Sequence, residues 1–296
     1  MRDYRGYGPT PPDPRWPGGA RLALVVVLNV EEGAEPSVGD GDGYSETAVS
    51  DALPGGVPEG ARDHVAETLF EYGSRVGFWR LHAEAQARGL PLTVNACAQA
   101  LERNPELAAA VAAHDLCCHG ERFVSPATMA PEAEAASMAR AVESLTRTVG
   151  RPPLGWQSRY SPSDATRALL LDHGGFLYDA DSHADDLSYW VRVGERPHLV
   201  VPHGFIHNDN RLTNGRLGTG EDFLAHLLAA LRVLHGEGGR MMTVSLHARV
   251  SGQPSRFDAV RRFLDAVAGL EGVWCAGRSA VARHWIATHP AGGPGA

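Results

Sequence analysis

Lysine is absent from the chain, and all 27 of its basic residues are arginine. No Schiff-base lysine and no lysine general base is therefore available, which excludes the reactions that depend on either. No stretch approaches the roughly 18 apolar residues of a membrane span. The first 19 residues, rich in Pro and Gly, lack the apolar core of a signal peptide. The sequence therefore predicts a cytoplasmic protein.

Cysteine is also scarce, with four residues at 97, 117, 118 and 275. None of them forms a CxxC pair, and the adjacent Cys117 and Cys118 cannot both turn inward on one strand. We expect free thiols in a reducing compartment rather than disulfides or a structural zinc. The formal charge of -8 and the pI near 5.9 argue against nucleic acid and anionic membranes as partners. A small-molecule substrate is the expected partner.

Short apolar runs alternate with amphipathic segments along most of the 296 residues. The runs predict strands at 21–29, 92–96, 115–118, 154–157, 176–179, 198–202, 241–247 and 273–276. Helical periodicity fills 66–89, 105–115, 131–150, 221–238 and 256–270. The segment 33–60 is rich in Gly, Pro and acids and predicts a long loop. We expect an arm at 1–20, one domain over 21–290 and a disordered tail at 291–296.

Repeated strand–helix units with no linker between them predict an α/β protein, a single (β/α) barrel of seven or eight strands. A doubly wound open sheet is the competing fold. That fold needs a glycine-rich phosphate turn after an early strand, and the sequence NVEEGAEP at 29–36 is not such a turn.

Polar side chains follow nearly every predicted strand. Because the carboxyl ends of barrel strands share one face, we expect these side chains to meet in one pocket. The residues are Asn29, Glu31, Glu32, Asn95, His119, Glu121, Gln157, Ser158, Arg159, Asp179, Asp181, Asp185, Asp186, His203, His207, Asp209, His247, Arg249 and Arg278. Histidines and acids at so many strand ends indicate chemistry rather than solvated loops.

The same positions carry a resemblance to the polysaccharide deacetylase superfamily, and more closely to its allantoinase branch of uric-acid degradation. The matching segments are NVEEG at 29–33, FEYGSRVGFWRL at 70–81, CHGERF at 118–123, GGFLYDADSHADDLSYW at 174–190, HNDNRL at 207–212, TVSLHARVSGQPSR at 243–256 and ARHW at 282–285. The resemblance covers about residues 5 to 290. It implies a deacetylase-like (β/α) barrel, and an assembly of several copies is the usual state of such allantoinases.

The resemblance also implies a metal site that this chain matches only in part. The deacetylases bind a divalent metal with an acidic pair and an H-x-x-x-H motif. Here Glu32 and His119 match ligands of that site, but Phe123 stands where the second histidine belongs. No cofactor is therefore certain, and a divalent metal such as zinc stays open. Two loops depart from the allantoinase pattern, with Glu121 in one and Gln157 in the other, which puts allantoin itself in question.

The predicted reaction is hydrolysis of a non-peptide C–N bond by an activated water. We expect Glu31 or Glu32 as the base, and only one of them to reach the water, since neighbours on a strand point opposite ways. His247 is the expected acid, oriented by Asp179 or Asp181. The catalytic set is thus Glu31, Glu32, His119 and His247, with substrate contacts from Asn29, Glu121, Gln157, Arg159, Asp181, His207, Asp209 and Arg249. The alternatives are an N-deacetylase of a sugar or small metabolite, and a catalytically idle barrel that binds a ligand.

Overall fold

The structure, a computed structural model, describes residues 3–292. Its nine strands form one sheet and are β1 (Leu22–Val30), β2 (Leu92–Ala96), β3 (Asp115–Cys118), β4 (Gly155–Trp156), β5 (Tyr178–Asp179), β6 (Tyr189–Val193), β7 (Arg196–Val200), β8 (Arg240–His247) and β9 (Val273–Cys275). The strand order is β6-β7-β5-β4-β3-β2-β1-β8, and β9 pairs with β1. All pairs are parallel except β6 with β7.

The sheet curls toward closure between β8 and the segment that follows β7. Asn208 forms an isolated bridge with Ser245, and the amide of Asp209 donates to the carbonyl of Ser245 at 3.0 Å. This curled sheet, with helices outside it, confirms the predicted (β/α) barrel fold. The eight predicted strands all occur, with ends shifted by no more than two residues, and the antiparallel β6 is an addition.

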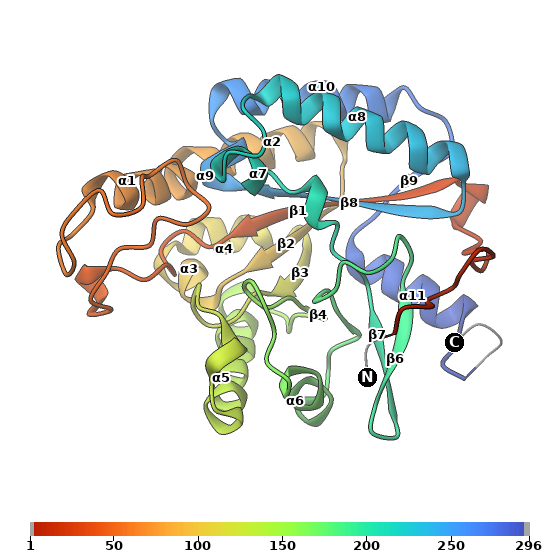
Figure 1. The fold of residues 1–296 in the computed structure, drawn as a ribbon, viewed down its shortest axis with the longest axis horizontal. Coiled ribbons are helices and arrows are strands. Elements are labelled where there is room, and N and C mark those ends of the chain that lie inside the picture. The colour runs from red at the N-terminus through yellow and green to blue at the C-terminus, as the bar shows by residue number, and fades with distance from the viewer. Residues whose placement is uncertain (1–2, 293–296) are drawn as a thin grey trace.

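Helices surround the sheet, and most of them cover its outer face (Figure 1). They are α1 (His64–Tyr72), α2 (Phe78–Arg88), α3 (Ala98–Arg103), α4 (Pro105–Val111), α5 (Pro131–Val149), α6 (Thr166–His173), α7 (Asn210–Thr213), α8 (Gly220–Glu237), α9 (Ala248–Ser251), α10 (Pro254–Ala268) and α11 (Arg278–Thr288). The five helical segments predicted from periodicity are present. The helices α3, α6, α7, α9 and α11 were not predicted. None of the described helices is long and apolar enough to cross a membrane.

Alternation along β1 divides the core in two. Leu22, Leu24, Val26 and Leu28 pack against the outer helices, whereas Ala23, Val25 and Val27 point into the barrel. Successive side chains of a strand face opposite sides of the sheet. At the lower end of the barrel, Trp16 of the N-terminal segment and Trp285 of α11 join the inner cluster. The barrel is therefore apolar below, and its upper part is left to polar groups.

A π-helical turn, Gly73–Gly77, joins α1 to α2 and lies against α9. A Cβ atom on Gly77 would lie 2.0 Å from the carbonyl oxygen of Ala248, and one on Gly73 would lie 2.6 Å from Oε1 of Glu32. Only glycine permits this approach, and π-helical turns often accompany functional sites. The turn thus places a helix directly behind the carboxyl end of β1.

The predicted loop at 33–60 extends to one side of the barrel (Figure 1). Arginines from other segments bind its acids, in the pairs Arg103–Asp40, Arg122–Asp42, Arg159–Glu46 and Arg256–Asp51. From residue 293 on, the predicted tail lies outside the described residues.

Candidate active site

The inward-facing positions of the strands end in polar residues that line one cavity. On β1 the alternation that buries Ala23, Val25 and Val27 continues to Asn29 and Glu31. The cavity has a volume of about 840 Å³. Its lining includes Asn29, Glu31, Val49, His119, Phe123, Gln157, Ser158, Arg159, Tyr160, Asp181, His183, His203, Asn208, Asn210 and His247. Three of the four predicted catalytic residues, Glu31, His119 and His247, therefore share one hollow.

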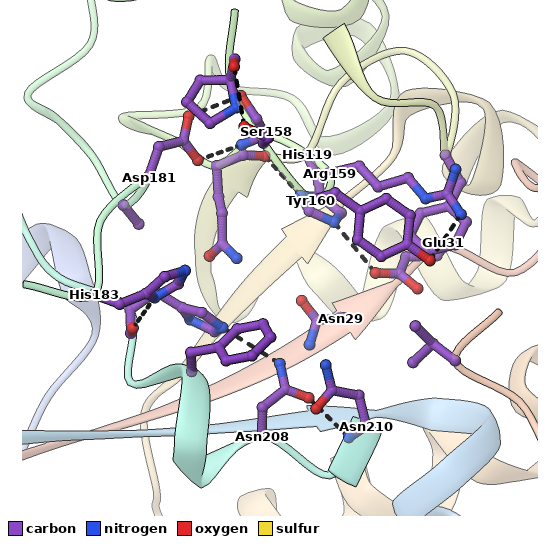
Figure 2. A pocket seen from close by; sticks show the side chains of 18 of the residues that line it. Asn29, Glu31, His119, Ser158, Arg159, Tyr160, Asp181, His183, Asn208 and Asn210 are labelled. Atoms are coloured by element: carbon purple, nitrogen blue, oxygen red, sulfur yellow. Dashed lines mark hydrogen bonds and ion pairs between the residues drawn. The ribbon is translucent and has the colours of Figure 1, made fainter. Parts of the chain in front are cut away.

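Glu31 is the centre of a charged cluster, and Figure 2 shows it in the cavity beside His119. Its Oε1 is 3.2 Å from Nε2 of His119 and 3.5 Å from Nε2 of His247. Its Oε2 accepts a hydrogen bond from Arg249 at 2.6 Å. Burial opposes ionisation of Glu31, but Arg249 and then His247 outweigh that effect and hold its pKa well below the usual value. Glu31 is therefore a carboxylate at neutral pH.

His119 presents one ring nitrogen to Glu31 because the other is taken. Its Nδ1 lies 2.6 Å from the carbonyl oxygen of Gln157, which can only accept. Nδ1 must therefore carry a proton, and Nε2 is the ring nitrogen that faces the Glu31 carboxylate. A water beside these two groups can hydrogen-bond to both.

Asp209 orients His247, in place of Asp179 or Asp181 as the sequence suggested. Its Oδ1 accepts from Nδ1 of His247 at 2.6 Å, and its Oδ2 accepts from the His247 amide at 2.8 Å and from Ser251 Oγ at 2.6 Å. Burial alone would lower the pKa of His247, but the carboxylates of Glu31 and Asp209 raise it to about 9. His247 is therefore an imidazolium at neutral pH, and its Nε2 proton points toward Glu31.

Glu32 faces away from the cavity, as alternation on the strand requires. Its Oε1 accepts from Arg249 at 3.0 Å, and its Oε2 accepts from the amide of Glu31 at 3.1 Å. Arg249 is 1% exposed and lies 4.3 Å from the ring centroid of Phe70. The guanidinium thus balances two buried carboxylates behind the cavity instead of lining it.

Arg159 and its neighbours form the wall on the loop side. Arg159 lies 3.9 Å from the ring centroid of Phe123 and forms an ion pair with Glu46, and its Nε has no partner among the described residues. Val49 and Tyr160, which also line the cavity, have left-handed φ angles of 54° and 59°. Non-glycine residues adopt this region rarely, and such strain often accompanies functional sites.

Asp181 lies at another side of the cavity (Figure 2). Its oxygens accept from the amide and from Oγ of Ser158, each at 2.7 Å. Burial and then the nearby Asp179 raise the pKa of Asp181 to about 7. Asp179 itself is bound by Arg167 and His198. Asp181 can therefore exchange a proton near neutrality.

Four predicted substrate contacts do not line the cavity. Asp209 and Arg249 act behind it, as described above. Glu121 turns outward and binds Arg140 and Ser137 of α5. His207 is buried beside His226, with ring centroids 5.7 Å apart. His203 does line it, as expected for a strand-end residue, and so do Asn208 and Asn210, which were not predicted and for which only their position in the loop after a strand could have indicated this.

The side chains present do not fit a metal ion. Among residues 3–292 no three His, Cys, Asp or Glu side chains are arranged to hold one. The two predicted ligands are separated, because Glu32 faces Arg249 while His119 faces Glu31. The Phe123 ring, with Arg159 against it, lies where a further histidine would be needed. Tight zinc binding usually takes three protein ligands, so no reaction step is assigned to a metal.

The chain is similar to known proteins along nearly its whole length, and the solved structures among them share its fold. A crystal structure of a probable polysaccharide deacetylase from Pseudomonas aeruginosa PAO1 is 42% identical, covering 98% of this chain and 99% of its own, with a TM-score of 0.93. The structure of PuuE allantoinase is 41% identical, covering 98% of each chain, with a TM-score of 0.93. A Schizosaccharomyces pombe protein named "Putative polysaccharide deacetylase" is 30% identical over 98% of both chains. No protein-family model matches the chain.

Proposed function

The chain belongs to the polysaccharide deacetylase family of hydrolases that act on carbon–nitrogen bonds, and we propose that it opens a cyclic amide, ureide or imide with an activated water, as an allantoinase does. One observation carries the proposal: Nε2 of His119 and the imidazolium of His247 both lie within 3.5 Å of Oε1 of the Glu31 carboxylate. The relationship to PuuE allantoinase, at 41% identity, supports the ring-opening reaction.

The first step is attack of water on the ring carbonyl. Glu31 and His119 hold the water, Glu31 Oε1 accepts its proton, and the water oxygen bonds to the carbonyl carbon. Arg249 keeps Glu31 ionised but also weakens it as a base, whereas burial of the carboxylate acts in the opposite direction and favours its protonated form. The oxyanion that forms can accept from Arg159, whose Nε has no partner within residues 3–292.

The second step breaks the C–N bond. His247 donates its Nε2 proton to the leaving nitrogen as the electron pair of that bond moves to it. The products are a carboxylic acid and an amine or ureide on the same opened chain. Asp209 holds the imidazole in the correct orientation and stabilises its charge before the transfer. The proton on Glu31 then returns to His247, and no co-reactant besides water is consumed.

Deacetylation of a sugar or small metabolite is the second candidate. It is favoured by the cavity volume of about 840 Å³, which exceeds what a single five-membered ring fills. It is disfavoured by the side chains available to bind a metal, because the family's metal-dependent deacetylases use as a ligand the histidine that Phe123 replaces here.

A hydrolysis screen decides between the two candidates. Wild-type protein and Glu31→Gln are assayed with allantoin, hydantoins, cyclic imides and N-acetyl sugars, following ring absorbance and released acetate. We expect ring opening by the wild type and at least about a hundredfold lower rate in Glu31→Gln, the usual scale for a general base. Glu121→Gln, which changes a carboxylate outside the cavity, is the control. Acetate release without ring opening would establish the deacetylase instead.

Assembly and location stay predictions. We expect a homo-oligomer in the cytoplasm, with a small molecule as the partner. Sedimentation of the purified protein tests the first of these.

A further inference from the structure

Arg278 places a buried positive charge behind the cavity. The side chain is fully buried at the start of α11 and forms no ion pair with a carboxylate of residues 3–292. The nearby Asp115 accepts from Thr93 Oγ1 and from the amide of Ser279. An unpaired buried charge costs several kcal/mol and persists only where something offsets it. The groups around the guanidinium must therefore provide that compensation or point to what does.

The guanidinium occupies the acceptor atoms of two side chains that line the cavity. It donates from Nη1 to Oε1 of Gln157 at 2.6 Å and from Nη2 to Nδ1 of His203 at 2.7 Å. Asn95 also donates to Oε1 of Gln157, at 2.8 Å. Arginine can only donate, so His203 Nδ1 must be unprotonated and its ring proton must be on Nε2. Burial and then Arg278 lower the pKa of His203, which keeps the ring neutral.

Asn208 adds a third donor beside these two. Its Oδ1 accepts from the amide of Asn210 at 2.9 Å, so Nδ2 is the atom turned toward His203, 3.3 Å from Nε2. Both of these nitrogens carry hydrogen, and two donors do not bond to each other. Side by side, they can instead share one acceptor. Figure 2 shows Asn208 across the cavity from Glu31, with Asn29 between them.

We propose that Gln157, His203 and Asn208 form a subsite that binds a carboxylate of the substrate, with the Arg278 guanidinium directly behind it. The three side chains offer N–H groups to the cavity because their acceptors are already in use. A carboxylate only accepts, and its charge also offsets that of Arg278. A neutral carbonyl would satisfy one donor and leave the cation unbalanced.

This inference rests on the proposed function and names its substrate class: cyclic amides or ureides that carry a carboxylate away from the reacting carbonyl. Arg159 is a poorer candidate for this role, because Glu46 already neutralises it. Arg278 is a positioning residue in this scheme, since it acts through Gln157 and His203.

The test compares an acid with its amide in the absence of turnover. Glu31→Gln protein is titrated by calorimetry with hydantoin-5-acetic acid and with the primary amide of that acid. We expect the acid to bind about tenfold to a hundredfold more tightly, the scale of charge-assisted hydrogen bonds. Adding Asn208→Asp, which places a carboxylate among the donors, should weaken the acid at least about tenfold and leave the amide within about threefold. Asn214→Asp, outside the cavity, is the matched control.

Equal affinity for the acid and the amide, or binding of neither, overturns the subsite. So does an Asn208→Asp variant that is folded by thermal denaturation and still prefers the acid. If Glu31→Gln does not fold, the ratio of the two KM values in the wild type replaces the titration. A preference for the acid without hydrolysis of any substrate keeps the subsite and refutes the proposed reaction. Rapid opening of neutral rings without a preference for the acid refutes the subsite and keeps the proposed reaction.

Discussion

Replacing Asp209 by asparagine tests whether His247 is the acid. The substitution keeps the size of the side chain and an oxygen that can face His247 Nδ1, but it removes the charge. In the native protein the pKa of His247 is raised from 6.5 to about 9, against its burial, by the carboxylates of Glu31 and Asp209. Loss of the second carboxylate should move that pKa back toward 6.5.

The size of the effect depends on pH in a defined way. If the pKa falls to 6.5, the protonated fraction of His247 at about pH 8.5 drops roughly 75-fold, whereas at about pH 6 it barely changes. The same shift also affects the free energy of unfolding. A group whose pKa is higher in the folded state contributes its full stabilisation below pH 6.5, and that contribution is lost as the pH rises through about 9. The difference of about 2.5 units corresponds to roughly 3 kcal/mol. The lowered pKa of Glu31 describes part of the same interaction, so the two are not added.

The assay is kcat against pH with the best substrate of the hydrolysis screen. We expect the alkaline limb to lie near pH 9 in the wild type and to move down by one to two units in Asp209→Asn. Ser251→Ala removes the other side-chain donor to Asp209 without touching the bond to His247, so its limb should stay in place. An alkaline limb that does not move in folded Asp209→Asn protein would refute the role of His247 as the acid.

Three further predictions concern other parts of the molecule. Burial and Asp179 raise the pKa of Asp181 to about 7, so its ionisation costs stability as the pH rises from 3.8 through 7, and Asp181→Asn should raise the Tm at pH 8 but not at pH 4. Gly77→Ala places a Cβ 2.0 Å from the carbonyl oxygen of Ala248, so it should lower the free energy of unfolding, measured in urea, by at least about 1–3 kcal/mol. Gly236→Ala lies in a helix with open space around it and should be neutral or stabilising. Equal effects of the two substitutions would contradict the close approach. Dialysis against a chelator should leave activity unchanged, and a loss of more than half that zinc restores would overturn the conclusion that the side chains do not fit a metal ion.

Strand alternation made much of the fold and of the cavity predictable. Glu31 comes directly after β1, His119 directly after β3, and His247 ends β8. Each of them occupies an inward-facing position, so all three lie inside the barrel. The same rule explains why Glu32, one residue later, turns outward to Arg249. Periodicity located the longer strands and helices because burial on one face imposes it. The edge strand β6 was not predicted because none of its residues is fully buried, and α6 and α11 were not predicted because their apolar residues are not confined to one face.

Contacts between distant segments could not be predicted from strand alternation. Asp209 and His247 are 38 residues apart, and Asp179 and Asp181 were equally plausible partners until their own contacts with Arg167 and Ser158 were known. Loop direction was equally hidden. Glu121 follows a strand as Gln157 does, but it turns outward to α5.

Partly exposed ion pairs hold the outer part of the 33–60 loop, whereas buried contacts hold its inner part. The Arg103–Asp40 and Arg256–Asp51 pairs are partly exposed, whereas Arg159–Glu46 is buried, and the carbonyl of Val49 accepts from buried Arg249 at 2.8 Å. Dissolved ions screen exposed charges far more than buried ones. Rising ionic strength should therefore expose the outer part of the loop to proteases before it alters the wall beside Glu31, so the protein would be nicked while the cavity keeps its shape.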